Sequence, residues 1–180
     1  MRTVYFVTEN RSKFEEAKLL LKNVRLVMKN LKLAEIQTPD QEKVVLDKAR
    51  QAFYMLKKPV IVDDTGIYFD DYENFPGTYT KPLVESIGFK GVERLLNGNR
   101  KAHFQTLLCY KDAETEKVFA GVWKGRIARS ISRKFNPEWQ YNSIFVPEGF
   151  RKHLSEIPME ERARHSHRKK AIIKLMRWLR

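Results

Sequence analysis

A short apolar run that ends in two adjacent carboxylates constrains this chain more than any other stretch. Val60, Ile61 and Val62 follow a proline, and three consecutive β-branched residues are typical of a short buried strand. Asp63 and Asp64 come directly after them, followed by a threonine and a glycine. Ligands in open α/β sheets bind where strands end. The stretch therefore predicts a strand that stops at a polar site.

The two carboxylates are expected to aim in different directions, because successive strand residues point to opposite faces of a sheet. One of them can then hold a metal ion while the other orients a water molecule. By itself, an Asp-Asp pair after a strand is most often an ordinary turn. The functional interpretation therefore depends on agreement with polar stretches elsewhere in the chain.

Length and composition indicate a single globular domain. The chain has 180 residues, 42% of them apolar, which is enough for a hydrophobic core. No apolar run approaches the roughly 18 residues of a membrane span, and no signal peptide precedes the first predicted strand, so we expect no membrane partner. The lone Cys109 cannot form an internal disulfide and sits in an apolar run, which favours burial and a cytoplasmic location.

The net charge of +13 admits two interpretations. A basic protein attracts polyanions such as nucleic acid, acidic membranes or phosphorylated metabolites. A charge-rich surface that serves solubility or heat stability would have the same composition. Composition alone does not choose between them.

The N-terminal segment predicts an anion site. A strand over 3–7 leads into a polar turn, and a helix follows in which Ser12 and Glu15 have the spacing of a capping box. A helix N-terminus directly after a strand offers free backbone N–H groups and a favourable dipole. The turn adds a hydroxyl, an amide and a cation, which are Thr8, Asn10 and Lys13. A simple capped helix is the alternative on this stretch alone.

The remaining patterns predict a mixed α/β protein. They favour a strand region over 24–33, a helix over 41–56, a helical region after Pro82 that Gly88 and Gly91 interrupt, strands over 103–111, 118–123 and 143–146, and a last helix capped by Ser166. The antiparallel strands are the best candidates for a second lobe, which we expect to be built mainly from about 67–145.

A loop rich in aromatic and amide side chains precedes the strand at 143–146. Tyr141 and Asn142 suit a flat heterocycle, which binds by ring stacking together with hydrogen bonds at its edge. Aromatic residues that pack in a core would give the same pattern. Beyond this loop, His167 and Arg168 stand at the start of the last helix, where a bound anion is favoured.

Six motifs, taken in order, resemble the Ham1-like, or inosine triphosphate pyrophosphatase, family over nearly the whole chain. They are the T-x-N-x-x-K loop at Thr8, Asn10 and Lys13, the acid Glu35, Lys48 in the second helix, Asp63-Asp64-Thr65-Gly66, Phe75-Pro76-Gly77 with Lys81, and Ser166-His167-Arg168. Each motif is weak alone. Six in the family's order, each at a predicted strand or helix end, are a specific signal.

The resemblance implies an α/β fold with an elongated mixed central sheet, flanked by helices and divided into two lobes with a cleft between them, in one domain over 1–180. It implies an enzyme, usually a homodimer, that hydrolyses non-standard purine nucleoside triphosphates such as ITP, dITP and XTP. The products would be the monophosphate and pyrophosphate, and the reaction would cleanse the nucleotide pool. Such a substrate needs Mg²⁺ and several cations, because a triphosphate carries about four negative charges.

The resemblance also implies a role for each matched residue. Glu35 and Asp63 would hold Mg²⁺, with Asp64 sharing it and acting as general base on the attacking water. The phosphates would be bound by Thr8, Asn10, Lys13, Lys48 and Lys81, and the substrate also by Thr65 and Arg162. Tyr141 would stack on the base beside Asn142, and His167 with Arg168 would read its 6-oxo group.

Three departures from the family pattern leave the base preference open. Gln140 and Asn142 replace a glycine and an acid of the base-reading loop, Glu9 replaces a glycine near the phosphates, and Arg162 stands where lysine is usual. Two alternatives therefore remain. One is a pyrophosphohydrolase for another modified nucleotide. The other is a nucleotide- or RNA-binding protein on the same scaffold with weakened catalysis, although nucleic acid is the less favoured partner.

Overall fold

One mixed β-sheet organises the chain in the computed structural model, which describes residues 1–96 and 98–179 apart from the side chains of Glu138 and Trp139. The strand order is β2-β1-β3-β5-β6-β7, with β4 paired to β3. The strands are β1 (Thr3–Val7), β2 (Arg25–Lys29), β3 (Val60–Phe69), β4 (Pro76–Gly77), β5 (Lys101–Lys111), β6 (Glu116–Ile127) and β7 (Phe145–Pro147). The helices are α1 (Arg11–Leu20), α2 (Gln41–Leu56), α3 (Thr80–Leu95), α4 (Met159–His165) and α5 (His167–Trp178), with 3-10 turns η1 (Pro137–Ser143) and η2 (Leu154–Glu156). The expected α/β class is confirmed.

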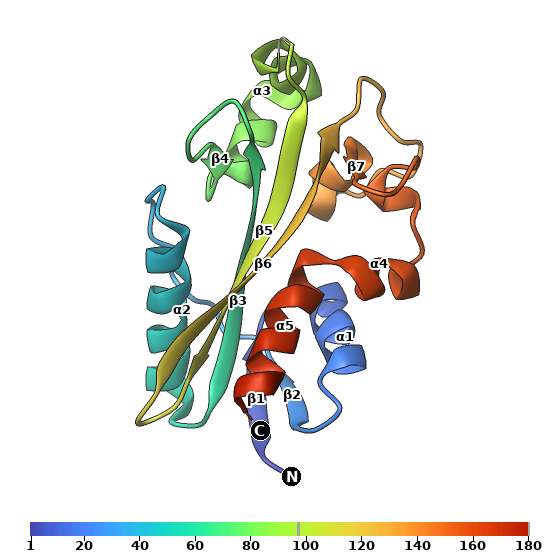
Figure 1. The fold of residues 1–180 in the computed structure, drawn as a ribbon. Helices are drawn as coiled ribbons and strands as arrows, with labels where there is room; N and C mark the ends of the chain where they lie inside the picture. Colours follow the sequence, from blue (N-terminus) through green and yellow to red (C-terminus); the bar gives the residue numbers. More distant parts are fainter. Residues whose placement is uncertain (97, 180) are drawn as a thin grey trace.

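The long strands β3, β5 and β6 form the antiparallel centre of the sheet (Figure 1). β3 and β5 pair from Val60 opposite Lys111 to Phe69 opposite Ala102. β1 joins β3 in parallel, and β2 continues the sheet in parallel to β1. The sheet is therefore mixed and elongated, as the sequence predicted.

Helices cover both faces of the lower half of the sheet. α2 lies on one side, and α1 and α5 lie on the other (Figure 1). Val45 and Ala49 of α2 pack in one core cluster with Val60 and Val62 of β3, whereas Ile61 belongs to the cluster beneath α1 and α5. A strand that is covered on both faces is apolar at every position rather than at every second one. This explains the uninterrupted apolar start of β3.

β3 does not stop at its carboxylates. It continues to Phe69, so Asp63 and Asp64 lie within the ladder, opposite Leu108 and Leu107 of β5. The prediction that the strand ends before them is wrong, because pairing with β5 satisfies the backbone through this polar stretch. Gly66 is needed where β4 approaches, since a Cβ there would lie 2.5 Å from the carbonyl oxygen of a glycine in β4.

The upper half has its own hydrophobic cluster. It joins Ile67 and Phe69 of β3 with Trp123 of β6 and with Leu154 and Ile157 around η2. α3 covers this cluster and bends at a glycine, residue 88, whose φ is 61°. A positive φ favours glycine, and the break predicted at this position is confirmed.

Other predicted elements are confirmed or corrected in their boundaries. The helix over 41–56 and the last helix with its Ser166 cap are present as predicted. The second strand is shorter than the predicted 24–33. Cys109 is buried, and this burial raises the pKa of its thiol to about 12. Within the described part of the chain, every helix is too short or too polar to cross a bilayer.

Candidate active site

The alternation of β3 separates its two carboxylates. Asp63 points to the face that α1 and α5 cover, and Asp64 points to the face that α2 covers. Each carboxylate meets side chains from the helices of its own face. The prediction that the two would aim differently is confirmed, and the result is one charged cluster on each side of the strand.

Asp63 is the acceptor in a buried ion-pair cluster. Lys13 Nζ donates to its Oδ1 at 3.0 Å, and Arg168 Nε donates to its Oδ2 at 3.0 Å. Burial alone would raise the pKa of Asp63, but the two cations outweigh burial and lower this pKa. The pKa of Lys13 is lowered in turn, because burial removes water from its ammonium group and Asp63 compensates only in part.

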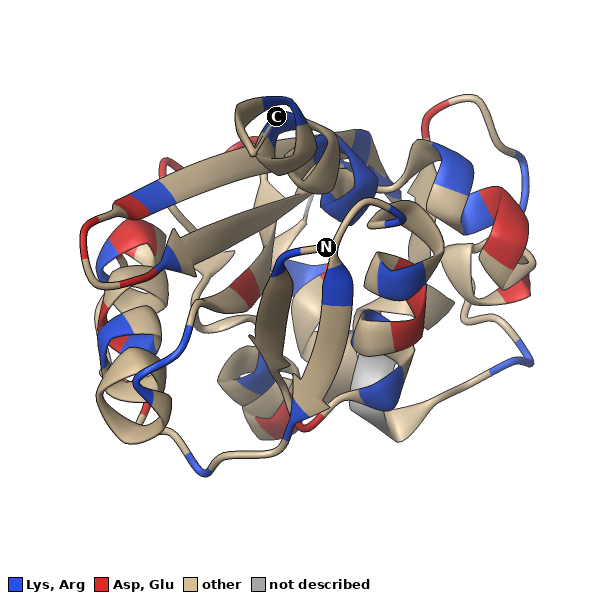
Figure 2. Cartoon of the chain, turned by 90° about the horizontal axis from the view of Figure 1, so that it is seen from below, with Lys and Arg blue, Asp and Glu red and all other residues tan. Residues whose placement is uncertain are grey.

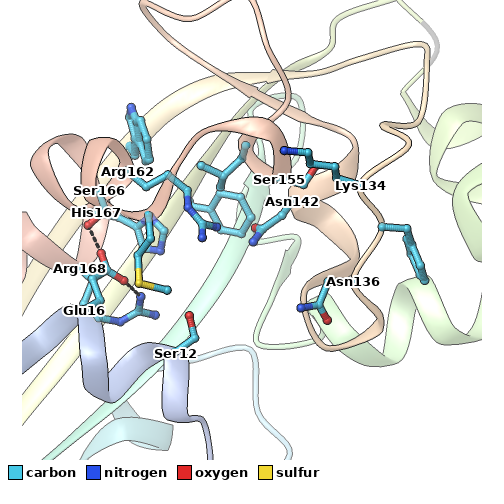
Figure 3. A pocket seen from close by; sticks show the side chains of 15 residues that line it. Ser12, Glu16, Lys134, Asn136, Asn142, Ser155, Arg162, Ser166, His167 and Arg168 are labelled. Carbon is cyan, nitrogen blue, oxygen red and sulfur yellow. Dashed lines mark hydrogen bonds and ion pairs between the residues drawn. The ribbon is translucent and has the colours of Figure 1, made fainter.

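Glu16 extends this cluster along α1. Its carboxylate accepts hydrogen bonds from the guanidinium of Arg168 and from the hydroxyl of Ser166 (Figure 3). Burial would lower the pKa of Arg168, but Glu16 and Asp63 raise it overall. Sequence reasoning missed Glu16, although it lies three residues after Lys13 and therefore on the same side of the helix.

Asp64 belongs to a second cluster on the α2 face. Gln41 Nε2 donates to its Oδ2 at 3.0 Å, and Lys48 Nζ lies 3.5 Å from its Oδ1. Lys48 Nζ also lies 3.6 Å from Glu35, so one ammonium stands between two carboxylates. Burial would lower the pKa of Lys48, but Asp64 and Glu35 raise it overall. The Tyr68 hydroxyl donates to Gln41 at 2.9 Å and orients its amide, a contact that the sequence did not indicate.

Glu35 and Asp64 lie around one cation position, whereas Asp63 lies on the other side of the strand. The carboxylates of Glu35 and Asp64 surround one cation position, which the ammonium of Lys48 takes. Two carboxylates with phosphate oxygens and water are a ligand set that Mg²⁺ accepts. No three His, Cys, Asp or Glu side chains of the described residues are grouped to hold a metal. Asp63 faces the other side of the strand and binds two cations there, so its predicted share in holding a metal stays a prediction.

Thr8 and Asn10 shape the turn that leads to Lys13. Thr8 Oγ1 accepts from the backbone of Asn10 at 3.1 Å, and Asn10 Oδ1 accepts from the backbone of Lys13 at 3.0 Å. Asn10 is therefore the N-cap of α1, and the cap predicted at Ser12 is wrong by two residues. The phosphate contacts expected of Thr8 and Asn10 stay a prediction.

A first cavity, of about 470 Å³, lies between α1, the two C-terminal helices and the loop that ends in η1 (Figure 3). Four predicted substrate-binding residues line it, together with Phe104 and Glu16. The four are Asn142, Arg162, His167 and Arg168. The structure thus brings together side chains that are separated by up to 152 positions in the sequence, from Glu16 to Arg168.

A second cavity, of about 150 Å³, lies beside the Asp64 cluster. The predicted residues that line it are Glu35, Asp64, Thr65, Lys81, Tyr141 and Asn142. The Lys81 side chain is 79% exposed and lies 3.8 Å from Glu85, so it can turn toward a ligand at little cost. Phe104 and Asn142 line both cavities, which makes the two neighbours along one groove. Lys13 and Lys48 lie behind the lining and contact Asp63 and Asp64 instead.

Tyr141 is a buried aromatic residue of η1. Its side chain is 4% exposed, and it belongs to the upper core, where its ring packs against Phe69 at a centroid distance of 6.3 Å. Apolar packing holds the ring in the core, and the stacking of Tyr141 on a base stays a prediction. Phe104 is the aromatic residue common to both cavities, and its ring stacks on His167 at 5.1 Å. The Trp139 side chain, in the same loop, lies outside the described residues.

Two buried nitrogens of the first cavity lack a hydrogen-bond partner within the described structure. They are Nε of Arg162 and Nδ1 of His167. Burial, assisted by the charge of Arg168, lowers the pKa of His167 well below 6.5, so this imidazole is neutral at pH 7. Buried polar groups are normally paired, so unpaired ones that line a cavity indicate a polar ligand.

Comparison with known proteins agrees with this geometry. The sequence profile of the Ham1 family matches residues 4–178. The chain belongs to the Ham1 family. A dITP/XTP pyrophosphatase of Saccharolobus solfataricus is 36% identical over 177 residues, which cover 96% of this chain and 91% of the relative. A dITP/XTP pyrophosphatase of Thermococcus kodakarensis is 34% identical over 178 residues, which cover 97% and 95%.

A solved structure shows the same fold. The Ham1 protein of Staphylococcus aureus matches with a TM-score of 0.82 and 21% identity, over 99% of this chain and 98% of that one. In the chain described here, the Asp63 cluster and the Asp64 cluster lie on opposite sides of β3. Thr65 follows these two residues and connects the Asp63 cluster to the second cavity. The Thr65 hydroxyl accepts from Arg168 Nη2 at 3.3 Å, and the residue also lines the second cavity.

Proposed function

We propose that this Ham1 protein hydrolyses non-standard purine nucleoside triphosphates to the monophosphate and pyrophosphate. The observation that carries the proposal is the groove itself. A donor-rich cavity large enough for a base joins a smaller cavity whose wall carries Glu35, Asp64 and Lys81. The similarity to dITP/XTP pyrophosphatases over nearly the full length of both chains supports the same substrate class.

The triphosphate is assigned to the second cavity. Its charge requires cations, and Lys81 lines this cavity, while Lys48 stands just behind it. Glu35 and Asp64 would hold Mg²⁺ there, and the ion supplies charge neutralisation on the phosphates when it is bound. Lys13 donates a hydrogen bond to Asp63. We propose that Lys13 also contacts a phosphate group of the substrate, as predicted.

Asp64 is assigned the role of general base. Asp64 lines the second cavity, with Lys48 Nζ 3.5 Å from its Oδ1, while Gln41 donates to its Oδ2. Asp64 takes a proton from water, whose oxygen forms the new bond to phosphorus. The α,β-phosphoanhydride bond breaks, and pyrophosphate carries away its electron pair.

The purine base is assigned to the first cavity. Arg162, His167 and Arg168 line it, and a base with an oxygen at C6 accepts hydrogen bonds from such donors. An adenine base would place an amino group, itself a donor, against them. The resulting unpaired donors are a strong basis for rejection.

A substrate panel tests the proposal. Pyrophosphate and orthophosphate are measured separately with ITP, dITP, XTP, ATP and GTP, in the presence of Mg²⁺ and after its removal by a chelator. We expect pyrophosphate from the first three substrates, much slower turnover of ATP and GTP, and loss of activity without the metal. Release of orthophosphate only, or no product from any nucleotide, would refute the proposal.

Two further properties are part of the proposal. We expect a homodimer, as the family resemblance implies, and sedimentation velocity would test this. We also expect the protein to act in the cytoplasm. The lone cysteine is buried, with a raised thiol pKa, so the fold does not depend on an oxidising compartment.

A further inference from the structure

The polar lining of the first cavity is dominated by hydrogen-bond donors. The charged and titratable groups that face it are Glu16 from α1, Lys134 from the loop before η1, Arg162 from α4, and His167 and Arg168 from α5. Among the described side chains that line the cavity, Glu16 is the one carboxylate, and its oxygens are already engaged by Arg168 and Ser166 (Figure 3). His167 is neutral at pH 7. The cavity therefore offers a ligand positive charge and little competing negative charge.

Arg162 is a partly buried cation of this cavity that is only weakly compensated. It forms no ion pair within the described structure, and its buried Nε has no acceptor. Burial lowers its pKa, and Glu16 opposes this only in part. A partly buried cation without an ion pair has lost part of its hydration, and an anionic ligand at the same place offsets that loss.

Asn142 faces Arg162 across the cavity (Figure 3). Its side-chain amide can donate a hydrogen bond to an oxygen and carries no charge that would repel an anion. A carboxylate of the same shape would attract the amino group of guanine and repel an oxygen. Asn142 is therefore compatible with an oxygen at C2 of a purine. Arg162 favours a negative charge on the purine ring.

Hypoxanthine and xanthine differ in the number of their oxygens and in the charge of the ring. Hypoxanthine has one ring oxygen and is neutral near pH 7. Xanthine has oxygens at C2 and C6, and its nucleosides lose a ring proton between about pH 5 and pH 6, so the base itself is an anion at neutral pH. We propose that the first cavity selects the ring-deprotonated form of xanthine over hypoxanthine, and that Arg162 and Asn142 determine this selection. The inference rests on the proposed function, because it assigns the base of a nucleotide to this cavity.

The pH dependence of the specificity ratio tests the inference. The ratio of kcat/KM for XTP to kcat/KM for ITP is measured from pH 4.5 to pH 7.5 by pyrophosphate release. Ionisation of the enzyme affects both substrates and cancels in the ratio. We expect the ratio to rise by roughly tenfold as the xanthine ring loses its proton, and then to level off. A ratio that is flat, or that falls with pH, overturns the inference.

Three variants assign the effect to residues. Arg162→Gln removes the positive charge, and Arg162→Lys is its matched control, which keeps the charge. Asn142→Asp introduces a carboxylate without changing the shape. We expect Arg162→Gln and Asn142→Asp each to flatten the rise of the ratio, and Arg162→Lys to keep it. A rise that persists in both of the first two variants overturns the assignment.

A binding measurement separates the inference from catalysis. The ultraviolet spectrum of xanthosine monophosphate changes when its ring loses a proton, so its ring pKa can be followed while it is bound. We expect binding to the wild-type protein to lower this ring pKa, and binding to Asn142→Asp to lower it less. An unchanged or raised ring pKa on the wild-type protein overturns the inference.

Failure of the inference and failure of the proposed function look different. No pyrophosphate from any nucleotide refutes the proposed function. Pyrophosphate from both ITP and XTP, with a ratio that does not rise with pH, refutes only the selection of the anionic base. Circular dichroism of each variant shows that lost activity is not lost folding.

Discussion

Asp63 is held by two cations that come from opposite ends of the chain. Lys13 and Arg168 each lie 3.0 Å from one of its oxygens, and all three side chains are nearly inaccessible to solvent. Removing one partner of a buried ion cluster leaves the others uncompensated, which usually costs more than the cluster contributes.

We therefore predict that Asp63→Asn lowers the free energy of unfolding by about 3–5 kcal/mol, as measured by chemical denaturation. The matched control is Glu85→Gln, which removes an exposed ion pair with Lys81 and should change stability by less than about 1 kcal/mol. Equal effects of the two substitutions would show that Asp63 is not a structural anchor.

Asp64, one residue further along, is predicted to matter for catalysis rather than for folding. In Asp64→Asn, the side-chain carbonyl can still accept the hydrogen bond of Gln41, but the base is lost. We expect kcat for ITP to fall about 10²- to 10⁴-fold while the unfolding midpoint stays close to the wild-type value. Asp70→Asn, in the turn just after this strand and hydrogen-bonded to His103, is the control and should keep its activity. Unchanged turnover in Asp64→Asn would exclude Asp64 as the base.

His167 should make stability depend on pH. Its pKa is lowered well below 6.5 in the folded protein, so below pH 6.5 the unfolded chain binds a proton that the folded chain does not. Stability is therefore lost as pH falls below about 6.5, by at most about 1.4 kcal/mol per pH unit. Denaturation at pH 7 and pH 5.5 measures this loss. His167→Phe should reduce it, and an identical pH dependence in that variant would contradict the prediction.

At the scale of elements, one close contact positions α5 on the sheet. A Cβ at Gly121 of β6 would lie 2.0 Å from the carbonyl oxygen of His167, at the first turn of α5. This carbonyl oxygen belongs to the backbone, so it cannot rotate away from an added methyl group as a flexible side chain could. We predict that Gly121→Ala shifts the start of α5, lowers the unfolding midpoint and reduces kcat/KM, because His167 and Arg168 move with the helix.

The control for this prediction is Lys124→Ala, at an exposed position of the same strand. It should leave both the unfolding midpoint and kcat/KM near the wild-type values. If Gly121→Ala behaves like Lys124→Ala, the contact does not position the helix.

Elements with a strong local signal could be predicted from the sequence. The helix over 41–56 has both an apolar stripe and an N-capping aspartate, and its limits are confirmed. The length of β3 could not be predicted, because the polar residues at its centre look like a turn until β5 pairs with them. The N-cap of α1 was misplaced for a related reason. Asn10 and Ser12 both suit a cap, and only the backbone decides between them.

The site was predictable as a set of residue types but not as a geometry. The order of the motifs located Glu35, Asp64 and the C-terminal Arg168, and the structure places them around neighbouring cavities. The role of Tyr141 could not be predicted from its loop, because an aromatic ring that packs in a core and one that stacks on a base give the same sequence pattern. Gln41 carries no motif, and only the folded chain brings it to Asp64.

For the molecule as a whole, the net charge of +13 is distributed. In the view of Figure 2, Lys and Arg positions occur on several helices, strands and loops, with Asp and Glu positions among them. Binding to a nucleic-acid backbone requires many cations on one surface, and its affinity falls steeply with salt.

We therefore predict that RNA binds weakly and is released as NaCl rises from 50 to 200 mM, as measured by fluorescence anisotropy with a labelled single strand. Pyrophosphate release from ITP, whose phosphates meet enclosed cations, should depend less on salt over the same range. Tight RNA binding at the higher salt concentration, without hydrolysis, would favour the binding-protein alternative.

The contribution of α5 to the charged cluster has a consequence for biosynthesis. A ribosome-bound chain that has not yet reached Arg168 leaves Asp63 with a single cation, and the core beneath Ala171, Ile172 and Leu175 stays open to water. Such a nascent chain has the strands but neither a sealed interior nor a finished pocket for a nucleotide. Folding and competence to turn over substrate should therefore both begin only after that segment has left the exit tunnel.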